Sequence, residues 1–380
     1  MKTQLYNWHA KNGDIIDFSG FQMPVMYRSI KEEHMAVRNT TGLFDVSHMG
    51  RMWIEGHDAE NFLNLLVPRD LTKTQIGKAS YTFMLNEQGG FRDDMIFARI
   101  KRDKWLMVWN AGNLTKIKLW MESFKNTLNQ FVDLDISLMD ISPTSAMFAL
   151  QGPEYQDTLI AAFEGKIEAP LPWSIIRAKY NDIELLLSGT GYTGEKGCEI
   201  IILNTTFEEP IRAKKIWRLL IEAGSKPCGL GARDSLRLEA GLALYGNDID
   251  ENINPIEADL FFTPFIHMDK TYFIGKSQLE YFSDHMPNRT RVGFIAQKKG
   301  PSPRAGIHLL KDGQEIGIVT SGGFSPLLNI GIGMGYVLRS LSKEGTSIQY
   351  EVRGKFHEAK ILKFPLFDAT KYGKTRKSLD

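Results

Sequence analysis

A glycine pair followed by two aspartates and an apolar run constrains the fold of this 380-residue chain more than any other segment. Gly89 and Gly90 bend the backbone at low cost, so a hairpin turn is predicted here. The flanking segments 80–85 and 95–100 are apolar and have the composition of strands, and a third candidate strand follows at 105–109. This region is therefore predicted to form an antiparallel meander.

Asp93 and Asp94 stand where the second of these strands begins, and adjacent residues of a strand point to opposite faces. The face of Asp94 continues in apolar side chains only, whereas the face of Asp93 ends in Arg99. We therefore expect Asp94, rather than Asp93, to look into an apolar interior, where a carboxylate must be hydrogen-bonded, paired or used for chemistry. The alternative is that both are ordinary turn residues in water.

Composition excludes several classes of protein. Hydrophobic residues make up 43% of the chain and charged residues 24%, as in ordinary globular domains, and a formal net charge of +1 gives no global field for nucleic acid or acidic membranes. Cys198 and Cys228 are the two cysteines, and the eight histidines lack metal-ligand spacing, so neither a disulfide framework nor a metal site is predicted. No apolar run is long enough to cross a bilayer, so no membrane attachment is expected. Residues 1–17 lack the apolar core of a signal peptide, and we expect a bacterial cytoplasmic protein, or a mitochondrial matrix protein without its transit peptide.

The remaining pattern predicts the α+β class. Helices are expected at 30–41, 59–67, 114–128, 214–222 and 231–244, and further strands at 147–150, 183–187 and 198–203. Beyond residue 290 the sequence pattern changes, with six short strand candidates between 292 and 362. These strands indicate a small barrel or sandwich, and we place the domain boundary near residue 280.

Several short motifs lie in order along nearly the whole chain. They are DFSGFQMP at 17–24, GLFDVSHMG at 42–50, Tyr81, GGFRDD at 89–94, WNAGN at 109–113, LQGP at 150–153, TGYTGE at 190–195 with Glu199, GLGARDSLRLEAGLALYGNDIDE at 229–251, and IVTSG at 318–322. The ordered set resembles the aminomethyltransferase, or T-protein, family of the glycine cleavage system, and the segment 229–251 is its most specific part.

The resemblance implies a three-domain fold around a central tetrahydrofolate pocket. Domain 1 is then discontinuous, built from residues 1–50 and 140–245. Domain 2 is an antiparallel α+β unit at 51–139, residues 246–280 form a connecting segment, and residues 281–380 form the C-terminal β-barrel.

The reaction implied by the resemblance moves a one-carbon unit. An aminomethyl group on the dihydrolipoyl arm of a carrier, the H-protein, gives its methylene carbon to tetrahydrofolate, and ammonia is released. Tetrahydrofolate is the co-substrate, and the lipoylated H-protein is a transient partner. A carboxylate placed near the folate amines steers the attack and the proton transfers. By match to the motif that catalytic residue is Asp94, and Asp93 is expected to be structural.

The binding residues also follow from the motif match. Glu199 is expected to accept the adjacent N–H donors of the pterin, and Arg233 to contact a polar edge or a carboxylate of the folate. The alternatives are an exposed strand glutamate and an ordinary salt bridge. Arg237 is expected to be structural.

The wall of the pocket is expected to contain soft and flat side chains. Tyr81, Tyr192 and Met49 are candidates for contact with the folate rings, although each is also compatible with core packing. Asn110 is expected to hold the Asp94 strand or to touch the ligand. Tyr372 is the candidate tail residue that closes the pocket. His48 is interpreted as a satisfied core histidine rather than a catalytic base.

The sequence departs from the family pattern at Gly189, where an arginine is common, at Cys198, where an aromatic residue is usual, and at 258–262. The alternative functions are another tetrahydrofolate-dependent enzyme on the same scaffold, such as a demethylase of sulfur- or oxygen-bound methyl groups, and a non-catalytic folate-binding protein. Retention of Asp94 and of the DVSHM motif at 45–49 favours aminomethyl transfer over both.

Overall fold

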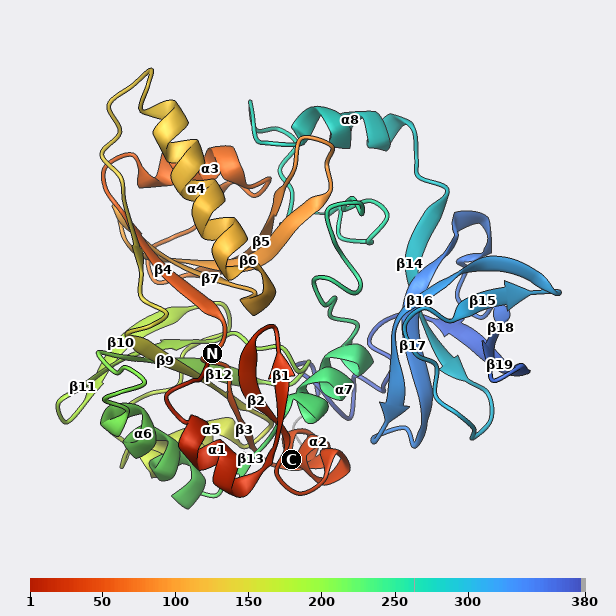
Figure 1. The fold of residues 1–380 in the computed structure, drawn as a ribbon, viewed down its shortest axis with the longest axis horizontal. Helices are drawn as coiled ribbons and strands as arrows, with labels where there is room; N and C mark the ends of the chain where they lie inside the picture. Colours follow the sequence, from red (N-terminus) through yellow and green to blue (C-terminus); the bar gives the residue numbers. More distant parts are fainter. Residues whose placement is uncertain (263, 377–380) are drawn as a thin grey trace.

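The computed structural model describes residues 1–262 and 264–376, and Figure 1 shows their arrangement. Two sheets lie one above the other on one side of the molecule, and a barrel lies on the other side. A long irregular segment after helix α7 (Leu230–Ala240) runs between them. The α+β class with a C-terminal barrel is thereby confirmed.

The first sheet has six strands in the order β10-β11-β12-β9-β3-β13. Their bounds are β3 Gly42–Asp45, β9 Ser145–Gln151, β10 Ile175–Tyr180, β11 Ile183–Ser188, β12 Gly197–Leu203 and β13 Lys226–Pro227. β3 comes from the N-terminal stretch, whereas the other five come from residues 145–227. This mixed origin supports the proposed discontinuous domain 1, because a strand from before residue 50 is hydrogen-bonded into a sheet built after residue 140.

The second sheet has five strands in the order β5-β6-β7-β4-β8. Their bounds are β4 Gly50–Glu55, β5 Ala79–Leu85, β6 Phe91–Lys101, β7 Lys104–Trp109 and β8 Ser137–Asp140. The predicted meander is confirmed by the antiparallel pairing of β5, β6 and β7. Asn86 closes the turn before β6, since its side-chain oxygen accepts the backbone N–H of Gly90 at 2.8 Å.

The two sheets pack against each other, and each is covered by helices on its outer face. Alternation along β12 sends Cys198 and Ile200 toward helix α6, whereas Ile201 joins the core between the sheets. In the same way Phe97 of β6 packs under the helices of the second sheet, whereas Ala98 packs between the sheets. The covering helices are α3 Ala59–Leu66 and α4 Leu114–Leu128 on the second sheet, and α5 Tyr155–Ala162 and α6 Ile211–Glu222 on the first.

This parity decides where two predicted site residues point. Glu199 lies on the same face of its strand as Ile201, two residues away, and Asp94 lies on the same face as Ile96 and Ala98. Both carboxylates therefore face the space between the sheets. Asp93 has the parity of Phe97 and points to the opposite face of its sheet, under the helices.

The expectation that Asp94, rather than Asp93, looks into an apolar interior is incomplete, because both aspartates do so, on opposite faces of their sheet. Asp93 is fully buried, whereas Asp94 is partly exposed. The reason is that both faces of the sheet are covered, so an apolar face no longer distinguishes inside from outside. Arg99, which made the other face look solvated, pairs with Glu60 of the covering helix α3.

The C-terminal domain is a closed barrel in the strand order β14-β17-β16-β15-β18-β19. The bounds are β14 Arg289–Ala296, β15 His308–Lys311, β16 Gln314–Ser325, β17 Ile330–Leu338, β18 Ser347–Val352 and β19 Lys355–Leu362. All six strands predicted after residue 290 are present. The barrel is closed by the pairing of β14 with β19, which leaves it without a free edge.

The remaining elements connect these bodies. They are α1 Tyr6–Asn12, β1 Asp14–Phe18, β2 Phe21–Met26, α2 Ile30–Asn39, α8 Lys276–Asp284, and the short 3-10 turns η1 Leu71–Lys73, η2 Ala111–Asn113 and η3 Arg339–Leu341. Ser29 caps α2 by accepting the backbone N–H of Glu32, as the capping-box pattern predicts. The helix predicted to extend to residue 244 ends at Ala240, because Gly241 adopts a left-handed conformation with φ of 78°.

Candidate functional site

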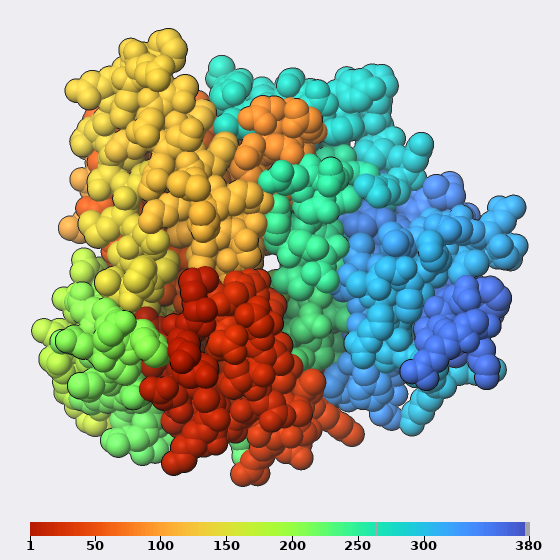
Figure 2. Space-filling model, viewed as in Figure 1, coloured from red at the N-terminus to blue at the C-terminus, as the bar shows by residue number. Residues whose placement is uncertain are grey.

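A cavity of about 300 Å³ lies between the two sheets, where they diverge beside the segment that follows α7. Its walls come from every part of the fold, and Figure 2 shows an opening in the surface where the N-terminal, second-sheet and α7-proximal regions meet. The volume is at the lower end of the range of small-molecule sites. The lining residues used below are Phe18, His48, Met49, Tyr81, Asp94, Asn110, Trp173, Thr190, Tyr192, Glu199, Arg233, Leu260, Phe265 and Lys374.

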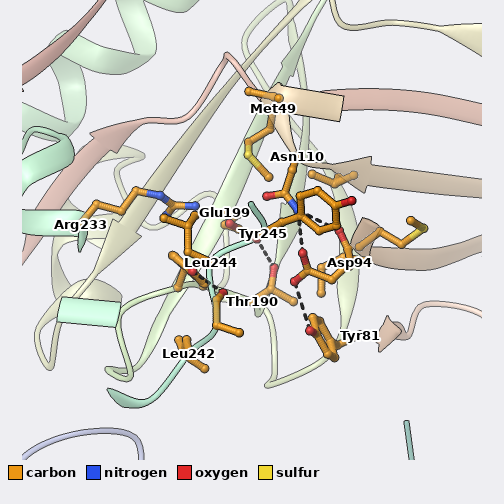
Figure 3. A pocket seen from close by; sticks show the side chains of 18 of the residues that line it. Met49, Tyr81, Asp94, Asn110, Thr190, Glu199, Arg233, Leu242, Leu244 and Tyr245 are labelled. Atoms are coloured by element: carbon orange, nitrogen blue, oxygen red, sulfur yellow. Dashed lines mark hydrogen bonds between the residues drawn. The ribbon is translucent and has the colours of Figure 1, made fainter. Parts of the chain in front are cut away.

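Asp94 is held in the cavity wall by two neighbours. The Tyr81 hydroxyl donates to Oδ2 at 3.1 Å, and the Asn110 carboxamide donates to Oδ1 at 2.7 Å. Figure 3 shows these side chains grouped on one side of the cavity. Burial raises the pKa of Asp94, whereas the two hydrogen bonds lower it and offset part of that rise. The carboxyl group is thereby brought toward the pH range in which it can both take and give a proton.

Asp93 supports this arrangement from behind. Its oxygens accept hydrogen bonds from the Asn110 backbone N–H at 3.2 Å and from the carboxamides of Asn110 and Asn113 at 2.9 and 2.8 Å. Burial and the neighbouring Asp94 carboxylate raise the pKa of Asp93. Because Asn110 donates to both aspartates, it couples the buried carboxylate to the one in the cavity.

Glu199 enters the same cavity from β12 of the first sheet. Thr190 donates its hydroxyl hydrogen to Oε2 of Glu199 and also lies within 2.9 Å of Ser188 Oγ. Oε1 has no hydrogen-bond partner among the residues that the structure describes. A carboxylate with one oxygen fixed and the other available suits a ligand that offers two adjacent N–H donors.

Arg233 reaches into the cavity from α7. Its guanidinium carbon lies 4.6 Å from the ring centroid of Tyr192, and its buried Nη1 atom has no hydrogen-bond partner within residues 1–262 and 264–376. Burial lowers the pKa of this guanidinium, and the nearby Tyr192 and Glu199 act in the opposite direction. In Figure 3 the Arg233 side chain points toward Glu199. The simple salt bridge considered for Arg233 does not form with any residue that the structure describes, whereas its neighbour Arg237 pairs with Asp248 at 2.7 Å.

Met49 and Tyr192 also line the cavity. The Tyr192 hydroxyl donates to the carbonyl of Ala243 at 2.5 Å, which fixes the ring as part of the wall. Seven of the eight residues expected at the site are thus brought together, although they come from six separate stretches of the chain. Their roles toward a ligand stay predictions.

Tyr372, the eighth, is not among the residues that line the cavity, and this expectation needs correction. Its backbone N–H donates to the carbonyl of Asp368, and the Arg376 guanidinium carbon lies 5.8 Å from the centroid of its ring. Lys374, two residues further on, lines the cavity instead, with its ammonium 5.8 Å from the ring centroid of Trp173. The sequence alone did not distinguish these two positions, because register in an irregular tail has no periodicity to follow, and closure of the cavity by the tail stays a prediction.

His48 is a cavity residue that sequence reasoning assigned to the core. It is buried, but its Nδ1 atom has no hydrogen-bond partner in the part of the chain that the structure describes. Burial, with a further contribution from the positive charge of Arg233, lowers its pKa to about 3. His48 is therefore neutral at working pH, as expected for a non-base, yet it is not a satisfied core histidine. Its place in the DVSHM motif was the available signal.

Two departures from the family pattern shape the rim of the cavity. A side chain at Gly189 would place Cβ only 2.1 Å from the carbonyl oxygen of Leu171, so glycine permits the close approach of the 171–174 turn. That turn places Trp173, at φ of 57°, in the cavity wall. Leu260, from the segment 258–262, and Phe265 also line the cavity.

Comparison with known proteins gives a consistent result. The family model described as the GCVT N-terminal domain matches residues 5–270, and that of the glycine cleavage T-protein C-terminal barrel domain matches residues 289–368. This chain belongs to the glycine cleavage T-protein family of aminomethyltransferases. The family resemblance stated from the motifs is confirmed, and with it the assignment to the transferases.

Individual members of the T-protein family match over nearly their whole length. A probable aminomethyltransferase of Pyrococcus horikoshii is 38% identical, with 99% of each chain covered. An aminomethyltransferase of Thermosipho melanesiensis is 40% identical, with 96% of each covered. The crystal structure of the glycine cleavage system aminomethyltransferase T from Bartonella henselae superimposes with a TM-score of 0.87 at 33% identity, covering 98% of this chain and 99% of that one. Among the described residues, no helix has the length and apolar character needed to cross a membrane.

Proposed function

We propose that this T-protein family member transfers the methylene carbon of an aminomethyl group, carried on the dihydrolipoyl arm of an H-protein, to tetrahydrofolate. The observation that carries the proposal is that Asp94 and Glu199, from two different sheets, both line one cavity. The two carboxyl groups differ in environment: Asp94 is held by Tyr81 and Asn110, whereas Glu199 has one oxygen available. Such a pair suits one proton-transferring group and one binding group.

The pterin of tetrahydrofolate fits the Glu199 side of the cavity. Its amino group and its neighbouring ring N–H are adjacent donors, and a carboxylate accepts both at once. Arg233 supplies an N–H that has no partner among the described residues and can donate to a polar edge of the ligand. Tyr192 and Met49 offer apolar surface for the rings. This placement turns the N5 and N10 amines toward Asp94.

The proton balance of the reaction explains why a carboxyl group of raised pKa is useful. The carbon forms bonds to N5 and N10 and loses its bonds to sulfur and to the amino nitrogen. The two hydrogens displaced from N5 and N10 appear on the released ammonia and on the dihydrolipoyl thiol, so no net proton is consumed. Asp94 serves as the relay, because it accepts a proton from a folate amine and returns it to a leaving group.

The proposed setting is the cytoplasm, or the mitochondrial matrix, with the lipoylated H-protein as a transient partner. The deciding experiment is a single-turnover assay with aminomethylated H-protein and tetrahydrofolate, measuring both 5,10-methylenetetrahydrofolate and ammonia. We expect equal amounts of the two products. Tight tetrahydrofolate binding with no product would contradict the donor, and would direct the search to methyl-sulfur and methyl-oxygen compounds. Failure to bind tetrahydrofolate would contradict the proposal as a whole.

A further inference from the structure

The DVSHM motif at 45–49 forms the link between the two sheets, because β3 of the first sheet ends and β4 of the second begins on either side of residues 46–49. These four residues make a tight turn, in which the backbone N–H of Met49 donates to the carbonyl of Val46 at 3.1 Å. The turn carries His48 and Met49, and both line the cavity. Its geometry therefore decides how two side chains are presented to a ligand.

The ring of His48 depends on this turn for its direction. Its Nδ1 atom has no hydrogen-bond partner in the described part of the chain. Its ring neighbours are Phe18 and Phe21, at 5.5 and 6.3 Å between centroids. Because no polar contact holds Nδ1, the ring is directed by the backbone of the turn and by packing. A group that fixes this backbone therefore also fixes the imidazole.

Arg51 fixes the turn from within the protein. Its side chain is fully buried, and each of the five N–H donors of its guanidinium has an acceptor. Nη1 donates to the carbonyls of Ser47, at 3.0 Å, and Met49, the two residues that flank His48. The other acceptors lie at the start of β9 and just before it: the carbonyls of Ser142 at 2.7 Å and Ser145 at 2.9 Å, and the Ser145 hydroxyl at 2.8 Å.

The five acceptors of Arg51 are four backbone carbonyls and a hydroxyl, and none is a carboxylate. Burial lowers the pKa of Arg51 to about 10, so the guanidinium remains charged at neutral pH. A buried cation must be compensated by the groups around it, so these carbonyls are held in place by Arg51 rather than by water. Its charge also lowers the pKa of His48, after the larger effects of burial and of Arg233.

Asp45 holds the opposite side of the same turn. Its Oδ1 accepts the backbone N–H of Ser47 at 2.9 Å, and its Oδ2 accepts from Thr3 and His9, each at 2.8 Å. A carboxylate thus binds an N–H group of the turn, and a guanidinium binds its carbonyls. The two charges match the polarity of the backbone that they hold.

We infer that Arg51 is a positioning residue for the transfer reaction, which acts through the turn at 46–49 to present the imidazole of His48 to the bound substrates. The inference rests on the proposed function, because it takes that transfer as the reaction that His48 serves. The turn is the route of this effect, since Arg51 contacts the carbonyls on both sides of His48.

Arg51→Gln and Arg51→Lys test the inference by kinetics. Glutamine removes the charge and reaches fewer of the acceptors, whereas lysine keeps the charge and three donors. We expect kcat/KM for aminomethyl transfer to fall about three- to tenfold in Arg51→Gln, as for loss of one hydrogen bond, and less in Arg51→Lys. In a His48→Phe background Arg51→Gln should cause no further loss, because Arg51 acts through His48.

Nuclear magnetic resonance of histidine-labelled protein gives a second measurement, which needs no substrate. The ring resonances of His48 are identified by their absence in His48→Phe, and they should shift in Arg51→Gln. The matched control is Arg339→Gln, since Arg339 also donates to three backbone carbonyls but lies outside the cavity wall. This control should lower stability in urea unfolding and leave both kcat/KM and the His48 resonances as in wild type.

The inference would be overturned by wild-type kcat/KM or unmoved His48 resonances in Arg51→Gln. An equal loss of activity in the His48→Phe background, or in Arg339→Gln, would overturn it as well. If Arg51→Gln does not fold, Arg51→Lys is compared in the same way. A wild-type protein without aminomethyl transfer would instead remove the proposed function, and the His48 resonances would still show whether Arg51 positions the ring.

Discussion

Tyr81 donates its hydroxyl hydrogen to Oδ2 of Asp94 across the β5–β6 pair, at an oxygen–oxygen distance of 3.1 Å. The two residues are diagonal neighbours on one face of the sheet, since Phe83 is the register partner of Asp94 and Tyr81 that of Ile96. A hydrogen bond to a carboxylate stabilises its ionised form, so this contact lowers the pKa of Asp94 while burial raises it. The sheet register therefore sets the balance that adjusts the proposed catalytic group.

The pH dependence of activity follows from this balance. Burial raises the pKa of Asp94 from its ordinary value to about 6, so kcat/KM should fall as pH decreases through about 6. Tyr81→Phe removes a donor that favours the carboxylate, and the acid limb should move to higher pH. The shift is measured from pH profiles of kcat/KM for both proteins.

Tyr192→Phe is the matched control for that profile. Its hydroxyl lies in the same cavity but donates to the Ala243 carbonyl, so the acid limb should stay near the wild-type position. An unshifted limb in Tyr81→Phe would show that another group controls the profile.

The raised pKa of Asp94 also affects the stability of the protein. The folded state holds a proton on Asp94 that the unfolded chain releases near pH 4, so this group's contribution to stability falls as pH rises from about 4 to about 6.

Substitution of Asp94 should lower activity, whereas substitution of the adjacent Asp93 should lower stability. Asp94→Asn keeps the shape of the side chain and removes the proton relay, so the single-turnover rate should fall about 10²- to 10⁴-fold with tetrahydrofolate binding retained. Asp93→Asn can keep an oxygen for the carboxamides of Asn110 and Asn113, which both donate to Oδ1, but it places an NH2 group against the Asn110 backbone N–H, which donates to Oδ2, and should destabilise the protein by about 1–3 kcal/mol. Turnover assays and urea unfolding of both variants check this; an active Asp94→Asn enzyme would exclude the relay.

Local patterns in the sequence were sufficient for most of the fold. The bounds of α4, and the presence but not the exact bounds of the meander and barrel strands, follow from apolar spacing and turn residues that lie within about ten positions of each other. The β1–β2 hairpin, β3, β4, β8 and β10 were not predicted from pattern. β3 is buried along its whole length and joins its sheet through β9, about a hundred residues later, so neither alternation nor a nearby turn marks it.

The site was predictable only through the family motifs. No regular sequence spacing relates Asp94, Glu199 and Arg233. The cavity lies between two sheets, and strand alternation directs Asp94 and Glu199 into the space between them. Residues outside the well-matched motifs were assigned less accurately, as Tyr372 and Lys374 show. His48 was given a core role because burial was expected to come with a partner, and the structure provides burial without one.

Glu199→Gln should weaken folate binding without loss of stability. The amide keeps one oxygen, which Thr190 can still approach, but it loses the charge and one of two acceptors for the pterin donors. The dissociation constant for tetrahydrofolate should rise about 10- to 100-fold, as expected for loss of a charge-assisted contact. Glu184→Gln on the neighbouring β11 is the control, since Glu184 is exposed and outside the cavity wall. Equal affinity in Glu199→Gln and wild type would place the pterin elsewhere.

The most specific motif, residues 229–251, also connects α7 to the barrel. Asp248 is fully buried and accepts from Arg237 at 2.7 Å and from Ser321 at 2.9 Å. Asp248→Asn leaves a buried guanidinium without its main partner and should cost about 3–5 kcal/mol, read from denaturant unfolding. Asp234→Asn removes an exposed partner of the same arginine and should cost about 1 kcal/mol or less. Similar losses of unfolding free energy in both variants would show that burial does not determine how much each ion pair of Arg237 contributes to stability.

His48 tests whether a neutral histidine in the cavity contributes to turnover. Its ring packs edge-on against Phe18, at 5.5 Å between centroids, so His48→Phe preserves the packing and removes both nitrogens. Because Nδ1 is buried without a partner in the described part of the chain, Nε2 is the nitrogen available to a bound molecule. Removal of Nδ1 should therefore not lower stability. We expect kcat/KM to fall about three- to tenfold in His48→Phe, and less in His48→Gln, which keeps a donor near the Nε2 position. The acid limb of the pH profile should stay unchanged in both, since a pKa of about 3 keeps His48 neutral throughout. Full activity of His48→Phe would reduce the role of this residue to packing.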